Sequence, residues 1–272
     1  MNNDKDSSFK RYKLKTHFAN ACLMATTAGL SAFCGYVFQK TTGIYPDSFS
    51  TMFASAFPLA MGGSVAGVST LASKPQAGSR YYNDNVSDEY RDILENIFDE
   101  AGYNKYVEVI QIDDSNADFI VEAIYGGKLY INEAKFSLLD EVGKKRILGH
   151  EASHFINHDG AFKNLNLWAG QIPSLLLMSA SALTFNPVSF GVSLVCTTGQ
   201  YLLDKKLSRN IEERADIEGA KLAGVTAEQL EESITFYDKL HCEMQGKKPL
   251  AGREQEYPTR KQVIETARMV LN

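Results

Sequence analysis

Three long stretches of this chain carry no charged side chain. They run from Thr16 to Gln39, from Ser48 to Ser73 and from Asn164 to Leu203. A bilayer core about 30 Å thick takes roughly 20 helical residues per crossing. The first two stretches are therefore each long enough for one membrane span and the third for two. A turn is expected at Asn186-Pro187 in the third stretch, because proline interrupts a helix.

The positive charges beside these stretches all fall on one side of such an arrangement. The loop between the first two stretches has only Lys40, and the turn at Asn186-Pro187 has no charge. The other flanks are basic, with Lys5, Lys10, Arg11, Lys13, Lys15, Lys74, Arg80, Lys163, Lys205, Lys206 and Arg209. Cytoplasmic loops of membrane proteins carry this excess of positive charge. The sequence therefore predicts two transmembrane helical hairpins, with both termini and the middle segment in the cytoplasm.

Two other interpretations of the apolar stretches remain open. Their alanine, serine and glycine content makes them only modestly hydrophobic, which also fits buried helices of a soluble protein. The first stretch follows a basic arm, as the apolar region of a secretory signal does, although Phe33 before Cys34 does not fit a lipoprotein-type cleavage site. The same small residues favour close helix packing, either within one chain or between copies in a homo-oligomer.

The overall composition excludes one class of partner. The 272 residues include 28 basic and 33 acidic ones, for a net charge of -5. The chain therefore lacks the basic surface that the phosphates of nucleic acid require, and we expect a lipid bilayer and no nucleic acid as partners. The cysteines have no paired or metal-finger spacing and are expected to be reduced thiols: Cys22, Cys34, Cys196 and Cys242.

The sequence divides into ranges of different character. Residues 1–15 form a polar, basic arm, which is expected to be poorly ordered and cytoplasmic. Residues 16–73 form the N-terminal hairpin and residues 74–86 a linker. Residues 87–272 are predicted to form one domain, interrupted by the second apolar hairpin at 164–203.

Hydrophobic periodicity predicts an α+β domain that is mainly helical and contains a small β-sheet. A helix is expected from a cap at Ser87 to Gly102. A second helix is expected from about Asp140 to His158, closed by Gly160. The expected strands lie at 106–112, 118–124 and 128–131, and the later helices at 208–222, 226–244 and 258–271.

The second of these helices contains His150, Glu151 and His154, which form the pattern HExxH. Residues four apart lie on one face of a helix, so the two histidines can present ring nitrogens to one metal ion at about 2.0–2.1 Å. Glu151 lies one step around the helix, where its carboxylate can take a proton from a water molecule without binding the ion. Because the chain has only 5 histidines, HExxH should arise by chance in fewer than roughly 1% of such sequences, so the pattern is a specific signal for a metal site.

Two histidines and one water molecule leave a tetrahedral zinc ion one protein ligand short. His158 is too distant, because it lies about 6 Å further along the helix than His154. The metzincin pattern would need a histidine at position 160, which is glycine. A carboxylate beyond the third apolar stretch is a better ligand, and either Glu212 or Glu213 satisfies the spacing. The alternative is that these acids belong to a solvated helix face.

Several features occur in a particular order along the chain. An apolar hairpin comes first, Asn116-Ala117-Asp118-Phe119 precedes Gly127-Lys128-Leu129-Tyr130-Ile131, and the HExxH helix and the second apolar hairpin follow. A segment of the pattern SRxxExxAD then begins at Ser208, and Tyr257-Pro258-Thr259-Arg260 lies near the C-terminus. In this order the chain resembles the HtpX-like and CAAX-prenyl-protease family of membrane zinc metallopeptidases. It departs from the family at Asp118, where an apolar residue is usual, and at Tyr257, where a histidine is common.

The resemblance implies a zincin-like metalloprotease domain that holds one zinc ion per chain. Its ligands would be His150, His154 and Glu212, and Asp216 would orient one ligand histidine through the other ring nitrogen. Glu151 would be the catalytic base.

The resemblance leaves two parts of the site open. Arg209 is predicted either to stabilise the oxyanion or to pair with Asp216. The strand that contains Asn116, Ala117 and Phe119, or else Leu129 to Ile131, is predicted to pair with an extended substrate.

We therefore predict a membrane-bound zinc metalloendopeptidase that acts on protein or peptide substrates. The resemblance to HtpX implies a multi-pass protein of the bacterial inner membrane, with its active site on the cytoplasmic side, that degrades damaged or misassembled membrane proteins. Prenylated peptides are a second substrate class. Two other functions remain open: a zinc-binding membrane scaffold without turnover, and a membrane-interaction protein without a metal.

Overall fold

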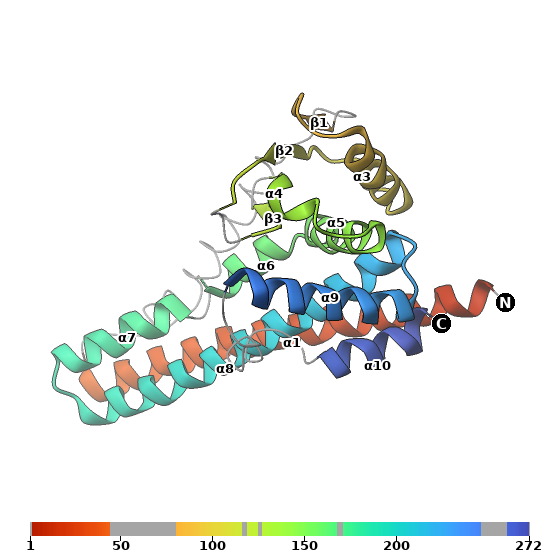
Figure 1. Cartoon of the computed structure of the whole chain (residues 1–272). Coiled ribbons are helices and arrows are strands. Elements are labelled where there is room, and N and C mark those ends of the chain that lie inside the picture. The colour runs from red at the N-terminus through yellow and green to blue at the C-terminus, as the bar shows by residue number, and fades with distance from the viewer. Residues whose placement is uncertain are drawn as a thin grey trace. The chain divides into compact units, whose positions relative to one another are not determined.

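The computed structural model of the chain describes residues 2–43, 80–115, 119–124, 127–167, 171–245 and 260–271 (Figure 1). The chain folds into two compact units. The first unit comprises Met1–Leu14, Ala72–Gly160 and Arg209–Asn272, and the second comprises Lys15–Leu71 and Ala161–Ser208. The described residues are mainly helical with one small sheet, as predicted.

The first unit contains most of the elements. They are β1 (Tyr81–Tyr82), α3 (Asp88–Glu100), β2 (Glu108–Ile112), β3 (Val121–Ile124), β4 (Lys128–Asn132), α4 (Glu133–Phe136), α5 (Glu141–Ile156), α9 (Ala227–Gln245) and α10 (Arg260–Leu271), with the start of α1 (Asn2–Thr42) and the end of α8 (Pro187–Leu222). The α6 helix (Asp159–Asn166) begins in this unit and continues into the second.

The sheet of the first unit is mixed, with the strand order β1-β2-β4-β3. The β1 and β2 strands and the β2 and β4 strands pair in parallel, whereas β3 pairs with β4 in the antiparallel sense. This order puts β3 at one edge of the sheet. The apolar core lies between the sheet and helices α3 and α5, and it includes Leu94, Ile97, Phe98, Val109, Leu129, Ile131 and Leu148.

Side-chain caps begin two helices of the first unit. The side chain of Ser87 accepts a hydrogen bond from the backbone N–H of Tyr90 and caps α3. The side chain of Asp140 caps α5 in the same way, with the N–H of Gly143 as the donor. Gly160, however, does not close α5: that helix ends at Ile156, and Gly160 lies inside α6.

Two segments expected to be irregular have regular structure instead. Residues 2–15 are the first turns of α1 and not a poorly ordered arm. Tyr81 and Tyr82, in the predicted linker, form β1, where Tyr81 N–H donates a hydrogen bond to the carbonyl oxygen of Val107. Sequence patterns miss so short a strand, because its pairing with β2 stabilises it and its own composition does not.

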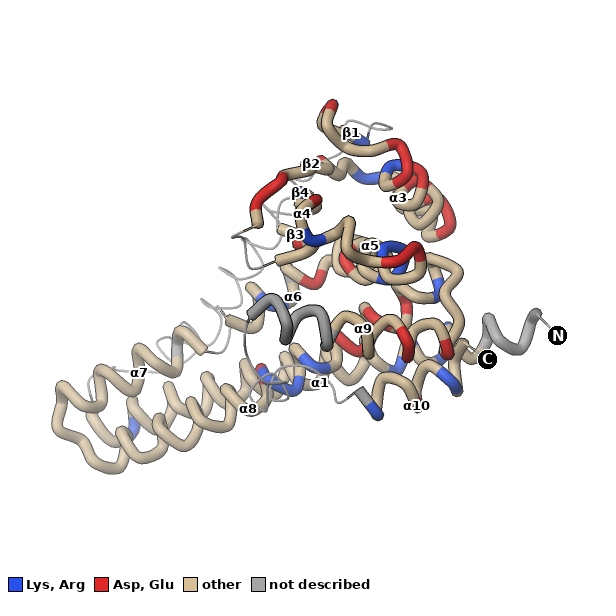
Figure 2. Tube along the Cα trace, viewed as in Figure 1, with Lys and Arg blue, Asp and Glu red and all other residues tan. Residues whose placement is uncertain are grey.

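The second unit is built from helices alone in its described residues. They are α1 from Lys15 onward, most of α6, α7 (Ile172–Leu183) and α8 as far as Ser208. The break between α7 and α8 falls at Asn186-Pro187, as predicted. Figure 2 shows no charged residue along α7 or the first turns of α8.

The polarity of the second unit is reversed relative to that of a water-soluble protein. Serine, threonine and glutamine lie inside: Thr27, Ser31, Ser174, Ser181, Ser189, Ser193 and Gln200 are buried. Large apolar side chains lie outside, among them Phe18, Phe33, Leu176, Leu183, Val195 and Leu202. Gln200 Nε2 donates to Ser31 Oγ over 2.8 Å and to the carbonyl oxygen of Thr27 over 3.0 Å, so polar bonds join α8 to α1.

One described helix is long and apolar enough to cross a membrane, by length and composition: the Ser8–Thr42 part of α1. The α7 helix contains a shorter apolar segment, Ser174–Leu183. The second predicted span, Ser48 to Ser73, lies outside the described residues, as do Asn116, Ala117, Asp118 and Tyr257. The two transmembrane hairpins therefore stay a prediction.

Candidate active site

The α5 helix carries His150, Glu151 and His154. Leu148 and Ala152 on the same helix are fully buried in the core of the first unit. Their burial fixes the rotation of α5 about its axis. The two histidines, four residues apart, consequently share a different face.

The backbones of α5 and α8 approach closely next to these histidines. A Cβ atom on Gly149 would lie 2.4 Å from the carbonyl oxygen of Gly219, and one on Gly219 would lie 2.4 Å from backbone atoms of Gly149 and His150. Only glycine fits at either position without moving a helix. This contact brings α8, and with it Glu212, up to the histidines of α5.

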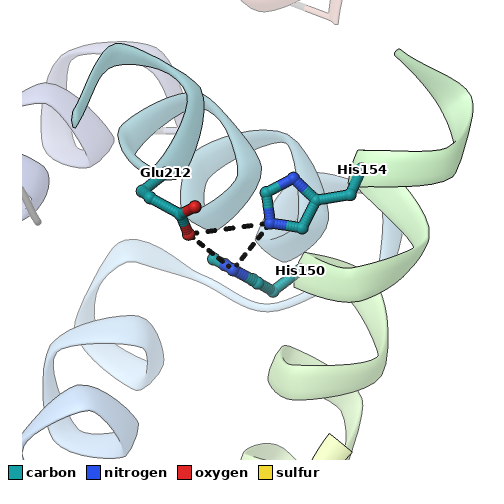
Figure 3. Close-up of side chains that lie close together, drawn as sticks. All are labelled: His150, His154 and Glu212. Carbon is teal, nitrogen blue, oxygen red and sulfur yellow. Dashed lines mark hydrogen bonds and ion pairs between the residues drawn. The ribbon is translucent and has the colours of Figure 1, made fainter. Parts of the chain in front are cut away.

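The side chains of His150, His154 and Glu212 face one another (Figure 3). The Nε2 atoms of the two histidines are 3.2 Å apart, and Glu212 Oε2 lies 3.3 Å from His150 Nε2 and 3.6 Å from His154 Nε2. Ligand atoms at about 2.0–2.1 Å from a tetrahedral zinc ion lie about 3.3 Å from one another. The three donor atoms thus match both the chemistry and the spacing of a zinc site.

Asp216 contacts the Nδ1 atom of His150, and Arg146 in turn contacts Asp216. His150 Nδ1 lies 2.9 Å from Asp216 Oδ1. A carboxylate can only accept, so Nδ1 carries the proton and Nε2 keeps its lone pair for a metal. Arg146 Nη1 donates to the same Asp216 oxygen over 3.3 Å, while Arg146 Nε donates to Ser233 Oγ over 2.9 Å and its guanidinium lies 5.2 Å from the ring centroid of Tyr237.

A second carboxylate supports His154. His154 Nδ1 lies 2.8 Å from Asp159 Oδ2, and the other oxygen of Asp159 is paired with the buried guanidinium of Arg214. Asp159 reaches back to His154 because His158 adopts the left-handed conformation, with φ at 56°, and turns the chain between α5 and α6. His158 itself contacts Lys105, with Nε2 2.8 Å from Lys105 Nζ.

Charge at the site favours a cation. Burial alone would lower the pKa of both histidines, but Asp216 and Glu212 raise the pKa of His150 well above its usual range, and Asp159 and Glu212 raise the pKa of His154 to about 9. Burial alone would raise the pKa of Glu212, but the two imidazoles hold that pKa well below its usual range. Carboxylates that stabilise positive charge this strongly suit a divalent metal ion.

Glu151 lies against the edge strand of the sheet. Its Oε2 accepts a hydrogen bond from the backbone N–H of Ala123 over 2.9 Å. Asn132 N–H donates to the carbonyl oxygen of Ile120, so Ile120 is a hydrogen-bonded position of the β3–β4 ladder. The alternation of an antiparallel pair then directs the N–H and C=O of Ala123 away from β4. The free edge of β3 therefore faces Glu151.

The structure narrows the alternatives for the substrate strand. The β4 strand, which contains Leu129 to Ile131, is paired on both sides, so it has no free edge. Phe119 lies just before β3, and Asn116 and Ala117 lie outside the described residues. The edge strand beside Glu151 is β3 (Val121–Ile124).

The two acids at 212 and 213 have separate surroundings. Glu213 accepts hydrogen bonds from Gln262 Nε2 over 2.7 Å and from Thr266 Oγ1 over 2.9 Å, so it contacts α10 and not the histidines. Arg209 is exposed on α8, and Arg146 donates a hydrogen bond to Asp216.

Sequence reasoning overlooked Arg146 and Asp159. Arg146 lies four residues before His150, on the same helical face, so its spacing was a usable signal. Asp159 lies five residues after His154, beyond the end of α5, and no helical spacing connects the two. Its role depends on the turn at His158.

Comparison with known proteins adds an independent result. A model of Peptidase family M48 matches residues 85–263, which is more than half of the chain. Searches of curated proteins and of solved structures returned no match. The M48 family consists of metal-dependent peptidases, and the matched range contains all three of the facing donor residues and Glu151. With this match and this cluster of side chains, the chain belongs to the M48 family of metallopeptidases.

Proposed function

We propose that the chain is a membrane-bound zinc metalloendopeptidase in which His150, His154 and Glu212 hold one zinc ion and Glu151 is the base. The observation that carries this proposal is the convergence of three donor atoms within 4.8 Å of one another, next to a carboxylate that is not one of them. Two imidazoles and one carboxylate form a ligand set of catalytic zinc sites, which keep a position open for water or substrate.

Each residue then has a distinct task. Zinc, when bound, is a Lewis acid that polarises the peptide carbonyl and makes a water molecule reactive near neutral pH. Glu151 takes a proton from the attacking water and returns it to the leaving amine. Asp216 and Asp159 keep the Nδ1 protons of His150 and His154 in place.

The β3 strand is the proposed binding edge for substrate. An extended peptide that pairs with it would lie beside Glu151, because the outward N–H of Ala123 already contacts that carboxylate. Main-chain hydrogen bonds of this kind give affinity with little sequence selectivity. Such tolerance fits a protease that removes damaged or misassembled membrane proteins, which is the role we propose. Arg209 is proposed either to stabilise the oxyanion or to pair with Asp216.

The second unit supports attachment to a membrane. Its buried serine, threonine and glutamine side chains and its exposed apolar ones are the arrangement expected where lipid replaces water outside. We propose that the stretches at 16–73 and 164–203 form two membrane hairpins and that the basic flanks keep both termini and the active site in the cytoplasm. Residues 87–272, apart from the second hairpin, would form the zincin-like domain.

A zinc-binding scaffold without turnover is the second function considered. Glu151 argues against it, because a structural zinc site has four protein ligands and needs no base.

The experiment is to measure zinc content and casein hydrolysis in detergent-purified wild type, Glu151→Gln, Glu212→Ala and Glu213→Ala. Wild type and Glu151→Gln should hold one zinc ion per chain, and only wild type should hydrolyse casein. Glu212→Ala should lose both zinc and activity. Glu213→Ala is the matched control and should keep both, because Glu213 contacts α10.

The outcomes separate the alternatives. A wild type without zinc would rule out the proposed site, and zinc without hydrolysis would favour the scaffold. Retention of zinc and activity in Glu212→Ala would remove Glu212 from the ligand set.

A further inference from the structure

Glu218 on α8 is a buried acid for which the mechanism above has no use. Its side chain is 3% exposed, and its Oε2 accepts hydrogen bonds from Ser153 Oγ over 3.1 Å and from Asn157 Nδ2 over 2.5 Å. Ser153 is next to His154 in sequence, and Asn157 caps the C-terminal end of α5. Glu218 therefore fixes the part of α5 from which His154 projects.

The charge that compensates Glu218 comes from the N-terminal segment of the chain. Lys13 Nζ lies 2.5 Å from Glu218 Oε1. Arg214 is also near, with Nε 3.9 Å from Glu218 Oε2, but its guanidinium is already paired with Asp159. A buried carboxylate is costly unless it is paired, so the hydrogen bonds that Glu218 makes to α5 depend on the charge of Lys13.

Aromatic contacts hold Lys13 in place. Phe9 and Tyr12 pack against the apolar cluster that α8, α9 and α10 form. The Nζ atom of Lys221 lies 3.9 Å from the ring centroid of Phe9. The contact between Lys13 and Glu218 is thus one of several that dock the start of α1 on the first unit, in contrast to an isolated surface ion pair.

We propose that Lys13 is a positioning residue for the metal site, acting through Glu218 to hold the end of α5 that carries His154. The inference rests on the proposed zinc site. If so, the segment before the first apolar span contributes to the peptidase site. The affinity for zinc would then depend on Lys13, which lies more than a hundred positions away from any ligand in the sequence.

The test is the zinc dissociation constant of the detergent-purified full chain, measured by competition with a chromophoric chelator. Lys13→Met should bind zinc about tenfold more weakly, at the lower end of the range for loss of a group that orients a ligand histidine, because Lys13 acts through Glu218. Arg11→Met removes the same charge from an exposed position of the same segment and should bind zinc like wild type. Lys13→Arg keeps the charge and should stay close to wild type.

A double variant tests whether Lys13 acts through Glu218. In Lys13→Met with Glu218→Gln, the neutral amide needs no counter-charge, and its carbonyl oxygen can still accept from Ser153 and Asn157. We expect most of the zinc affinity to return. Recovery would show that the unpaired charge of Glu218 causes the loss of zinc affinity.

The remaining outcomes count against the proposal. Lys13→Met with wild-type affinity, a Lys13→Arg as weak as Lys13→Met, or a double variant without recovery would each overturn it while leaving the zinc site intact. A wild type that binds no zinc would overturn the proposed function, and this inference with it.

Discussion

The two units of the chain differ in which kinds of side chain they bury and which they expose. The apolar core of the first unit contains Leu94, Phe98 and Leu129, whereas the second unit buries Ser174 and Gln200 and exposes large apolar side chains. Burial of apolar surface is favourable only where the alternative is water. Where the surroundings are lipid, helices gain from close packing and hydrogen bonds instead. This contrast is expected if the first unit faces water and the second faces lipid, as proposed above.

The largest difference should appear when an aromatic ring is removed. Phe98 is fully buried in the first unit, and Phe33 is 53% exposed on the second. Phe98→Ala should lower the free energy of unfolding by about 3–5 kcal/mol, because it leaves a cavity in the apolar core. Phe33→Ala should cost far less. Calorimetry of both variants in the same detergent measures the contrast, and equal losses would mean that the units do not differ in this way.

Glycine substitutions should show a difference of about 3 kcal/mol. An added Cβ on Gly219 meets backbone atoms at 2.4 Å, whereas one on Gly191 in the second unit meets nothing within 4 Å. Gly219→Ala should destabilise the protein by about 3 kcal/mol, at the upper end of the range for overpacked cores, and should weaken zinc binding because α8 must move away from α5. Gly191→Ala should leave zinc binding unchanged and should not destabilise the protein, because alanine favours a helix more than glycine does. Unfolding and zinc titration of the pair provide the measurement.

A lysine introduced at an exposed position should have different effects in the two units. Val195 on α8 is 72% exposed and Met269 on α10 is 70% exposed, so the two positions are matched in exposure. Val195→Lys should cost about 2.5 kcal/mol of membrane insertion, whereas Met269→Lys should have no effect. The fraction of protein that alkaline carbonate extracts from membranes gives the readout. If alkaline carbonate extracted neither variant, the result would contradict a lipid-facing surface at Val195.

The smallest effect is expected for a polar side chain inside the second unit. Gln200→Leu removes the hydrogen bonds to Ser31 and to the backbone of Thr27. Such bonds between membrane helices average about 0.6 kcal/mol, so a small decrease in thermal stability in detergent is expected. A loss of several kcal/mol would instead place Gln200 in a core of the soluble type.

The sequence predicted what depends on local pattern. HExxH located His150, Glu151 and His154 because four-residue spacing on a helix is a property of the segment alone. The Ser87 cap marked the start of α3 for the same reason. The choice between Glu212 and Glu213 depended on the resemblance, because adjacent residues of a helix cannot be ranked without knowing which face meets α5.

What the sequence left open depends on tertiary contacts. Residues 2–15 have the composition of a disordered arm, but Phe9 and Tyr12 find an apolar cluster that the rest of the first unit provides. Gly160 was expected to end α5 because glycine often ends a helix. In the structure the turn at His158 separates α5 from α6, and Gly160 lies inside α6. Arg146 lies on the right helical face, but its importance becomes visible only when Asp216 of α8 lies beside it.

The turn at His158 has a thermodynamic consequence. A residue with a side chain in the left-handed conformation carries roughly 1–2 kcal/mol of backbone strain that glycine would not. The chain keeps that strain between two helices, and it returns Asp159 to His154 within five positions. Strain of this kind persists only where the surroundings over-determine it, and here the buried pair of Asp159 and Arg214 does so. The turn at His158 therefore costs backbone strain, and it places Asp159 where its carboxylate orients the ring of the proposed ligand His154.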